Sequence, residues 1–279
     1  MGGAPHFGEH LDFGGSMLVA GRGVTFLKHA CRAVAPRGGS AAGPFRRLVA
    51  FPVLCAPAPR SFPPTGPPFF MEALLQSPIT LALLLLNVGI SGYAMLADPS
   101  LIDELSFRPR RITDRGEYYR FLTAGFVHAG GAHLAFNMIT LYFFGPQLEG
   151  VLGAGAFLVL YFGSEMTAHT LTFLVHRTDP HYAAVGASGA ISGVLFGFCL
   201  YAPLAMLGVM LVIPMPAILF AVLYVVVSIY AIGRRQHGPA GIAHEAHLGG
   251  ALGGVVLTIL LDYPRPINAF LREMQGLFG

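Results

Sequence analysis

The sequence predicts an all-α membrane protein, a bundle of six transmembrane helices with a structured first loop. The 279 residues are 54% hydrophobic and only 11% charged, whereas a soluble domain has roughly 25% charged residues. The charges cluster in short stretches between long runs that have none, which is typical of a chain crossing a bilayer several times. This composition excludes a soluble enzyme as the default class. The small net charge of +3 is scattered along the chain and indicates no nucleic-acid partner.

Residues 1–70 are rich in Gly and Pro and carry several Arg but few acidic residues. We expect a leader of low order there, similar in composition to a transit peptide, although its proline content argues against an amphipathic helix. Met71 directly precedes the first apolar run and is an alternative start for the natural product. We therefore divide the chain into this leader, a membrane domain at 71–265 and a short C-terminal tail at 266–279.

Six runs are long and apolar enough to cross a hydrocarbon core of about 30 Å at 1.5 Å per residue. The first is Pro78–Ala97, and the charged connector after it is long enough to fold by itself. Prolines at 214 and 216 interrupt any helix before the fifth run. The other predicted spans are Ala132–Leu148, Ala154–Val175, Ser188–Ala205, Ala217–Ile232 and His244–Leu261.

Spans two, four and six run in the same direction, so their N-terminal ends share one face of the bundle. Polar residues lie near each of these ends, namely His133, Asn137, Ser188, His244 and His247. Polar groups are costly in hydrocarbon and usually face a functional cavity. The sequence therefore predicts one polar site built by three helices.

His133 and Asn137 are four residues apart, so they share one helical face and can act together. The alternative is that both are structural and hydrogen-bond to neighbouring helices.

Ser188 stands among small residues at a predicted helix start, where unpaired N–H groups and the helix dipole favour a developing oxyanion. The alternative is that Ser188 and Ser192 only belong to a packing stripe with Gly189, Gly193 and Gly197.

In span six, His247, Gly250 and Gly254 fall on one face at i, i+3 and i+7. If these glycines pack against Gly189 and Gly193 of span four, the backbones approach closely and His247 can reach Ser188. An imidazole in that position can act as the general base for the serine hydroxyl.

Three elements together resemble the rhomboid family of intramembrane serine proteases over about residues 77–262. They are HxxxN at His133–Asn137, GxSG at Gly186–Gly189 and AHxxGxxxG at Ala246–Gly254, in that order along the chain. Arg120 and the residues after it also resemble the family's lead-in to span two, with Tyr119 where the family usually has Trp.

The resemblance implies that Ser188 is the nucleophile and His247 the base of a catalytic dyad that needs no cofactor. It also implies an oxyanion hole formed by Asn137, His133 and the Ser188 N–H group, with His128 in a supporting role at the upper edge of the cavity. The implied substrates are single-span membrane proteins, cut in their transmembrane helices within the lipid bilayer.

Span six also contains the element His244-Glu245-Ala246-His247, but a zinc-protease helix needs HExxH, and we expect no metal site. A structural or gating role is favoured for His244. Four further histidines fall in or beside predicted loops and are expected to be surface residues: His169, His176, His181 and His237.

Two rival functions remain open. One is a polytopic binding or transport protein that uses its histidines for protons or metal, which leaves the Gly-Ala-Ser-Gly element unexplained. The other is a catalytically inactive rhomboid-like chaperone, which the presence of both Ser188 and His247 argues against.

We expect an integral, multi-pass protein of a bacterial inner membrane, with an organellar inner membrane as the alternative. The family orientation puts both termini in the cytoplasm. The connectors on the active-site face are nevertheless rich in Arg, and the positive-inside rule applied to them alone predicts the opposite orientation.

Overall fold

The computed structural model describes residues 67–209, 213–232 and 243–277, so nearly all of the predicted leader lies outside the described residues. Helix α1 (Pro67–Leu75) crosses the boundary that the sequence analysis placed at residue 70. Helix α2 (Pro78–Leu96) matches the first predicted span and has a proline in its first turn, where no N–H partner is needed. The Glu149 carboxylate accepts hydrogen bonds from the Ile79 and Thr80 N–H groups, at 3.0 and 2.7 Å, and so caps α2.

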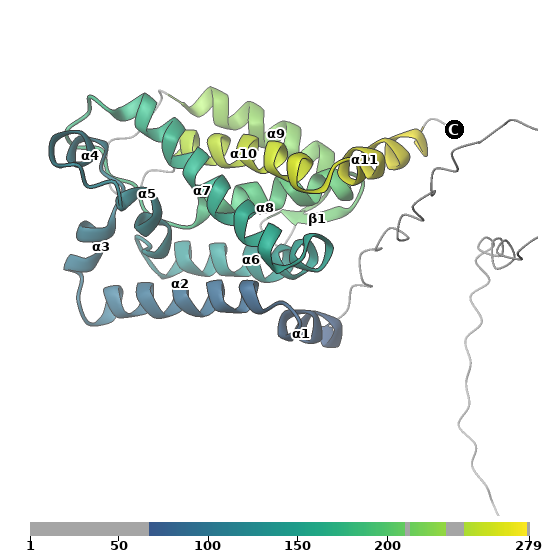
Figure 1. Ribbon diagram of the computed structural model, residues 1–279, viewed down its shortest axis with the longest axis horizontal. Helices are drawn as coiled ribbons and strands as arrows, with labels where there is room; N and C mark the ends of the chain where they lie inside the picture. The colour runs from purple at the N-terminus through teal and green to yellow at the C-terminus, as the bar shows by residue number, and fades with distance from the viewer. Residues whose placement is uncertain (1–66, 210–212, 233–242, 278–279) are drawn as a thin grey trace, which may run out of the picture. The chain divides into compact units, whose positions relative to one another are not determined.

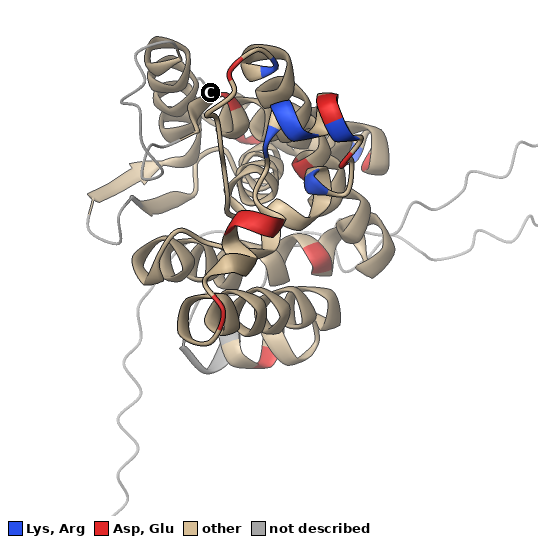
Figure 2. Cartoon of the chain, turned by 90° about the vertical axis from the view of Figure 1, so that its left-hand side faces the viewer, with Lys and Arg blue, Asp and Glu red and all other residues tan. Residues whose placement is uncertain are grey.

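The connector after α2 contains four short elements: α3 (Ser100–Leu105), α4 (Pro109–Arg115), α5 (Arg120–Thr123) and the 3-10 turn η1 (Ala124–Phe126). Arg120 is fully buried and donates to the Ser106 carbonyl at 2.6 Å and to the Glu117 carboxylate at 2.6 Å. The hydrogen bond from Arg120, aided by nearby arginine charges, lowers the pKa of the Glu117 carboxyl. Figure 2 shows the arginines and acids of this connector close together at one end of the molecule.

Five longer helices follow: α6 (Gly131–Leu152), α7 (Ala154–His176), α8 (Ser188–Tyr201), α9 (Ala217–Ala231) and α10 (His244–Asp262). Their starts agree with those of the predicted spans to within one residue, and the described chain is mostly helical, as predicted (Figure 1). By length and composition, α2, α7 and α10 are able to cross a membrane, while α8 and α9 are apolar but shorter.

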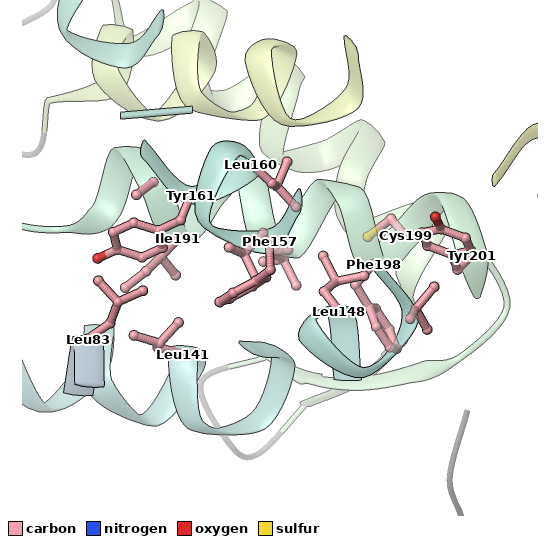
Figure 3. Close-up of a cluster of buried hydrophobic side chains, with 14 of the residues drawn as sticks. Leu83, Leu141, Leu148, Phe157, Leu160, Tyr161, Ile191, Phe198, Cys199 and Tyr201 are labelled. Atoms are coloured by element: carbon pink, nitrogen blue, oxygen red, sulfur yellow. The ribbon is translucent and has the colours of Figure 1, made fainter. Parts of the chain in front are cut away.

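Helix α8 lies in the middle of the bundle. Twelve of its residues are buried, and α6, α7 and α10 surround it. Phe157 and Leu160 of α7, Leu148 of α6 and Phe198 of α8 contribute to the main hydrophobic cluster (Figure 3). This helix begins with Ser188, the residue that the sequence predicts to be the nucleophile.

A short β-hairpin between α8 and α9 departs from the all-α prediction. Strands β1 (Met206–Val209) and β2 (Ile213–Pro216) pair antiparallel. The two prolines interrupt helical structure as predicted, and the chain forms strands on both sides of residues 210–212.

The predicted C-terminal tail contains a helix, α11 (Arg265–Gln275), which packs against the far end of α8. Its Glu273 carboxylate accepts a hydrogen bond from the Leu204 N–H group at 3.1 Å. Nearby, the Tyr201 hydroxyl donates to Asp262 at 2.5 Å, and Asp262 pairs with Arg265.

Candidate active site

Ser188 and His247 meet at the start of α8. The Nε2 atom of His247 lies 2.8 Å from the Oγ atom of Ser188, and both side chains are partly buried. Ser188 is the first residue of α8, and His247 lies in the first turn of α10. The two residues come from neighbouring helices that are far apart in the sequence, so their contact depends on how these helices pack.

Glycines allow α8 and α10 to approach closely enough for this contact. A Cβ atom at Gly250 would collide with the backbone of Gly189, and one at Gly254 would collide with the backbone of Gly193. At both places the obstacle is backbone rather than a side chain that could move. The predicted packing glycines therefore lie where the two helix backbones touch.

His133 and Asn137 on α6 lie beside the turn that leads into Ser188. Gly186 in this turn has a φ of 112°, a conformation that favours glycine. A Cβ atom there would lie 2.5 Å from His133 Cε1 and 3.5 Å from Asn137 Nδ2. Gly186 thus allows both side chains to approach the serine turn.

Asn137 has an unused hydrogen-bond donor at this position. The residue is buried, and its Nδ2 atom has no hydrogen-bond partner among the described residues. Buried amide N–H groups are almost always paired in folded proteins. A free donor beside a serine and a helix start is suited to an oxygen atom that arrives with substrate.

His128 is fully buried and contacts the residue that precedes Ser188. Its Nδ1 atom lies 2.8 Å from Ser91 Oγ, and its Nε2 atom accepts a 3.4 Å hydrogen bond from the Ala187 N–H group. Since Ser91 donates its proton to the Phe126 carbonyl, we assign the His128 proton to Nδ1. Burial, aided by the neighbouring His133, lowers the pKa of His128 to about 3, so the ring is neutral and supports the residue before Ser188.

Tyr224 on α9 is part of the site although the sequence analysis did not single it out. Its ring stacks on His247 with a centroid distance of 6.0 Å, and its hydroxyl lies 2.5 Å from Ser192 Oγ. Ser192 also donates to the Ser188 carbonyl at 2.7 Å. A tyrosine within an apolar run gives no signal of this role, because the contact requires the packing of α9 against α8 and α10.

Glu165 on α7 is a second residue that the sequence analysis missed. Its side chain is buried, and Oε2 accepts a 2.8 Å hydrogen bond from the Ala190 N–H group in the first turn of α8. The Oε1 atom lies 3.6 Å from His169 Nδ1. This carboxyl group therefore contacts the helix turn that carries Ser188.

Not all of the remaining histidines lie at the surface, where the sequence predicted them. His169 is buried, stacks on Phe107 and bonds the Phe121 carbonyl at 2.7 Å, so the prediction of a surface position was wrong. His176 is also covered: it stacks on Tyr182 and lies 3.1 Å from Glu245. His181 is exposed as predicted, and His237 lies outside the described residues.

The Glu245 carboxylate accepts a 2.5 Å hydrogen bond from the Tyr182 hydroxyl. The ring centroids of His244 and His247 are 6.3 Å apart, and the two rings are nearly perpendicular. Within the described ranges, no three His, Cys, Asp or Glu side chains are grouped so that they could hold a metal ion. The geometry thus assigns Glu245 to a contact between α10 and the loop that follows α7.

Comparisons with known proteins identify the family of this chain. The model of the Rhomboid domain matches residues 115–264, which is more than half of the chain. The putative rhomboid protease YdcA of Bacillus subtilis is 43% identical over 86 residues, covering 31% of this chain and 42% of YdcA. Rhomboid protease GluP of the same organism is 31% identical over 151 residues, covering 54% of this chain and 27% of GluP.

A vertebrate relative is similar to the same degree. The mitochondrial presenilin-associated rhomboid-like protein A of Danio rerio is 31% identical over 162 residues, covering 55% of this chain and 42% of that protein. The matched segments span less than half of the length of each of these three relatives. The domain match covers all the residues that build the site, and this chain is a member of the rhomboid family.

Proposed function

We propose that this chain is an intramembrane serine endopeptidase with Ser188 as nucleophile and His247 as general base. The observation that carries the proposal is the 2.8 Å approach of His247 Nε2 to Ser188 Oγ at the first residue of a helix. Membership of the rhomboid family and the apolar helices make the chain an integral membrane protein. Relatives named as rhomboid proteases support the proteolytic activity.

The proposed reaction begins with proton transfer from Ser188 Oγ to Nε2 of a neutral His247. The Oγ atom bonds to the scissile carbonyl carbon, and the carbonyl electrons move to its oxygen. When the C–N bond breaks, the imidazolium gives its proton to the leaving amine. A water molecule, activated by the same histidine, then hydrolyses the acyl ester and restores Ser188.

The oxyanion would be held by the Asn137 side chain, the His133 side chain and the Ser188 N–H group. The free Nδ2 donor of Asn137 and the contact of both side chains with Gly186 support this assignment. The start of α8 adds the positive end of a helix dipole. His128 acts indirectly, through its hydrogen bond to Ala187.

We further propose that α2, α6, α7, α8, α9 and α10 are the six spans of a membrane domain at 71–265. The substrates are then single-span membrane proteins, whose helix must unwind at the cut, because helical carbonyls are already hydrogen-bonded and shielded. The two Bacillus relatives favour a bacterial cell (inner) membrane.

Cleavage of a panel of single-span substrates in reconstituted vesicles tests the proposal. The wild type should cut within or beside the substrate's transmembrane helix, and Ser188→Ala should leave every substrate intact while folding normally. Mass spectrometry of the fragments gives the cut sites. Cleavage by Ser188→Ala would contradict the proposal. Loss of cleavage on chelation of metal ions would also contradict it and would favour a metal-dependent activity.

A further inference from the structure

The β1–β2 hairpin lies at the end of α8 opposite Ser188 and contains no polar side chain. Residues 202–216 are all apolar, Gly or Pro, and no charged residue or histidine occurs between Ser188 and Ile232. The connectors at 97–130, 177–187 and 232–243 each carry charged residues. Loops that lie in water between spans normally contain such residues, so this connector has the composition of a buried segment.

The hairpin is nevertheless poorly covered by protein. Leu207, near its base, is 7% exposed and joins the main hydrophobic cluster. Met206, at the base of β1, is 62% exposed, and Ile213, toward the tip of the hairpin, is 57% exposed. Figure 2 shows the two strands projecting sideways from the helices, without any charged residue on them. Contiguous apolar surface of this kind marks contact with a membrane or a partner.

The lengths of the adjoining helices favour the membrane. Helix α8 has 14 residues and α9 has 15, which give about 21 and 22 Å at 1.5 Å per residue. Both are shorter than a hydrocarbon core of about 30 Å. The exposed surface of α9, including Val222 and Val226, continues directly from β2 along the chain. The hairpin thus supplies apolar length where its two helices end.

The strand pairing also suits a lipid environment. Met206 pairs with Pro216, and Gly208 pairs with Pro214. One step further in the same register, the Ala217 N–H group bonds to the Ala205 carbonyl. Because hydrogen-bonded and non-bonded pairs alternate in an antiparallel ladder, the nitrogens of Pro214 and Pro216 face away from β1. The outer edge of β2 therefore has no N–H group at these two positions that would need a partner.

From these observations we infer that the hairpin is a membrane-embedded element that lies in the interfacial layer of the bilayer, with its exposed side chains in contact with lipid acyl chains. The interfacial level is favoured over the hydrocarbon centre, because the outward N–H groups of Met206 and Gly208 on β1 still need water or headgroup partners. The inference rests on the proposed crossing of the bilayer by α8 and α9.

Tryptophan fluorescence offers a direct test, because the chain contains no Trp. The variants Ile213→Trp and Met206→Trp place a single fluorophore on either strand of the full-length protein. Val226→Trp on exposed α9 serves as the control in lipid, and His181→Trp in the exposed loop after α7 serves as the control outside it. Each variant is reconstituted in phosphatidylcholine vesicles, with and without bromine on the acyl chains, and is also exposed to iodide in the aqueous phase.

We expect both hairpin variants to lose emission in brominated vesicles, as Val226→Trp does, and to resist iodide, whereas His181→Trp should show the opposite pattern. If Val226→Trp is quenched by bromine but both hairpin variants respond only to iodide, the hairpin lies in water and the inference is wrong. Hairpin variants shielded from both quenchers would indicate cover by protein and would equally overturn it. Failure of Val226→Trp itself would instead contradict the proposed crossing by α9.

Discussion

The helix pair α8–α10 and the helix α9 are both rich in apolar residues, yet the pair is closely packed and α9 is largely exposed. Twelve residues of α8 are buried, and glycines bring its backbone against that of α10. In α9, only Ala217 and Ser228 are buried, and many of its large side chains, such as Val222 and Val226, are exposed. Lipid tails are as apolar as these side chains, so no hydrophobic effect drives the helices together. Close packing through small residues holds them together instead.

This difference separates two tasks in the candidate site. Ser188 and His247, the proposed nucleophile and base, lie on the closely packed pair, which fixes the distance between them. Helix α9 contributes Tyr224, which reaches His247 and Ser192 from a helix with few buried contacts. We therefore expect changes in the close-packed pair to affect stability and activity together, and changes in α9 to affect activity modestly.

The largest effect is expected from Gly250→Ala. The new Cβ atom would collide with the Gly189 backbone, and overpacking of this kind typically costs about 1–3 kcal/mol. Because the two helices must separate, cleavage should fall by roughly a hundredfold or more. The matched control is Gly92→Ala in α2, where nothing lies within 4 Å of the added atom. Thermal unfolding in detergent and substrate cleavage measure both effects, and equal behaviour of the two variants would contradict close packing.

Asn137→Ala should act on the reaction with little effect on folding. Its Nδ2 atom has no partner to lose among the described residues, and removal of one oxyanion donor typically costs 10²–10³-fold in kcat, about 2.7–4 kcal/mol. Steady-state kinetics should show this loss in kcat with KM little changed. A fall in the unfolding temperature with kcat preserved would mean that Asn137 is structural.

Two variants of Glu165 test whether this residue positions the start of α8 through its hydrogen bond or only fills space. Glu165→Leu leaves the Ala190 N–H group buried without its acceptor, which typically costs about 1–3 kcal/mol. Glu165→Gln retains an oxygen at the same place, so we expect it to restore kcat and the unfolding temperature. If Gln is as harmful as Leu, the hydrogen bond to α8 is not what Glu165 contributes.

The smallest effect is expected at Tyr224. Tyr224→Leu removes the ring stacked on His247, which should cost about 0.5–1.5 kcal/mol, or roughly two- to tenfold in kcat. Tyr224→Phe keeps the ring and loses only the hydroxyl contact with Ser192, so its activity should lie between those of the wild type and Tyr224→Leu. A loss as large as that of Asn137→Ala would show that α9 is as essential to the site as the close-packed pair.

Much of the helix arrangement could be predicted from the sequence, because the residues that start and stop a helix lie close together along the chain. The starts of the long helices and the shared face of Ser188 and His247 followed from apolar runs, glycine spacing and the parity of the spans. The end of α8 was less accurate: it was predicted at Ala205, but the helix ends at Tyr201, close to Pro203.

Contacts between distant segments that no glycine pattern or motif marks were not predictable in this way. Tyr224 and Glu165 look like any polar residue in an apolar helix until α7, α8 and α9 are placed side by side. His169 was wrongly expected at the surface, because α5 and Phe107 of the first connector cover it. The hairpin was missed because two prolines in an apolar run predict only that a helix stops.

Labelling with a fluorophosphonate probe, mapped by peptide mass spectrometry, tests most directly that Ser188 is a nucleophile activated by His247. The wild type and the matched control Ser192→Ala should carry the adduct on Ser188. Ser188→Ala and folded His247→Ala should remain unlabelled. An adduct on another residue, or undiminished labelling of Ser188 in His247→Ala, would contradict the dyad.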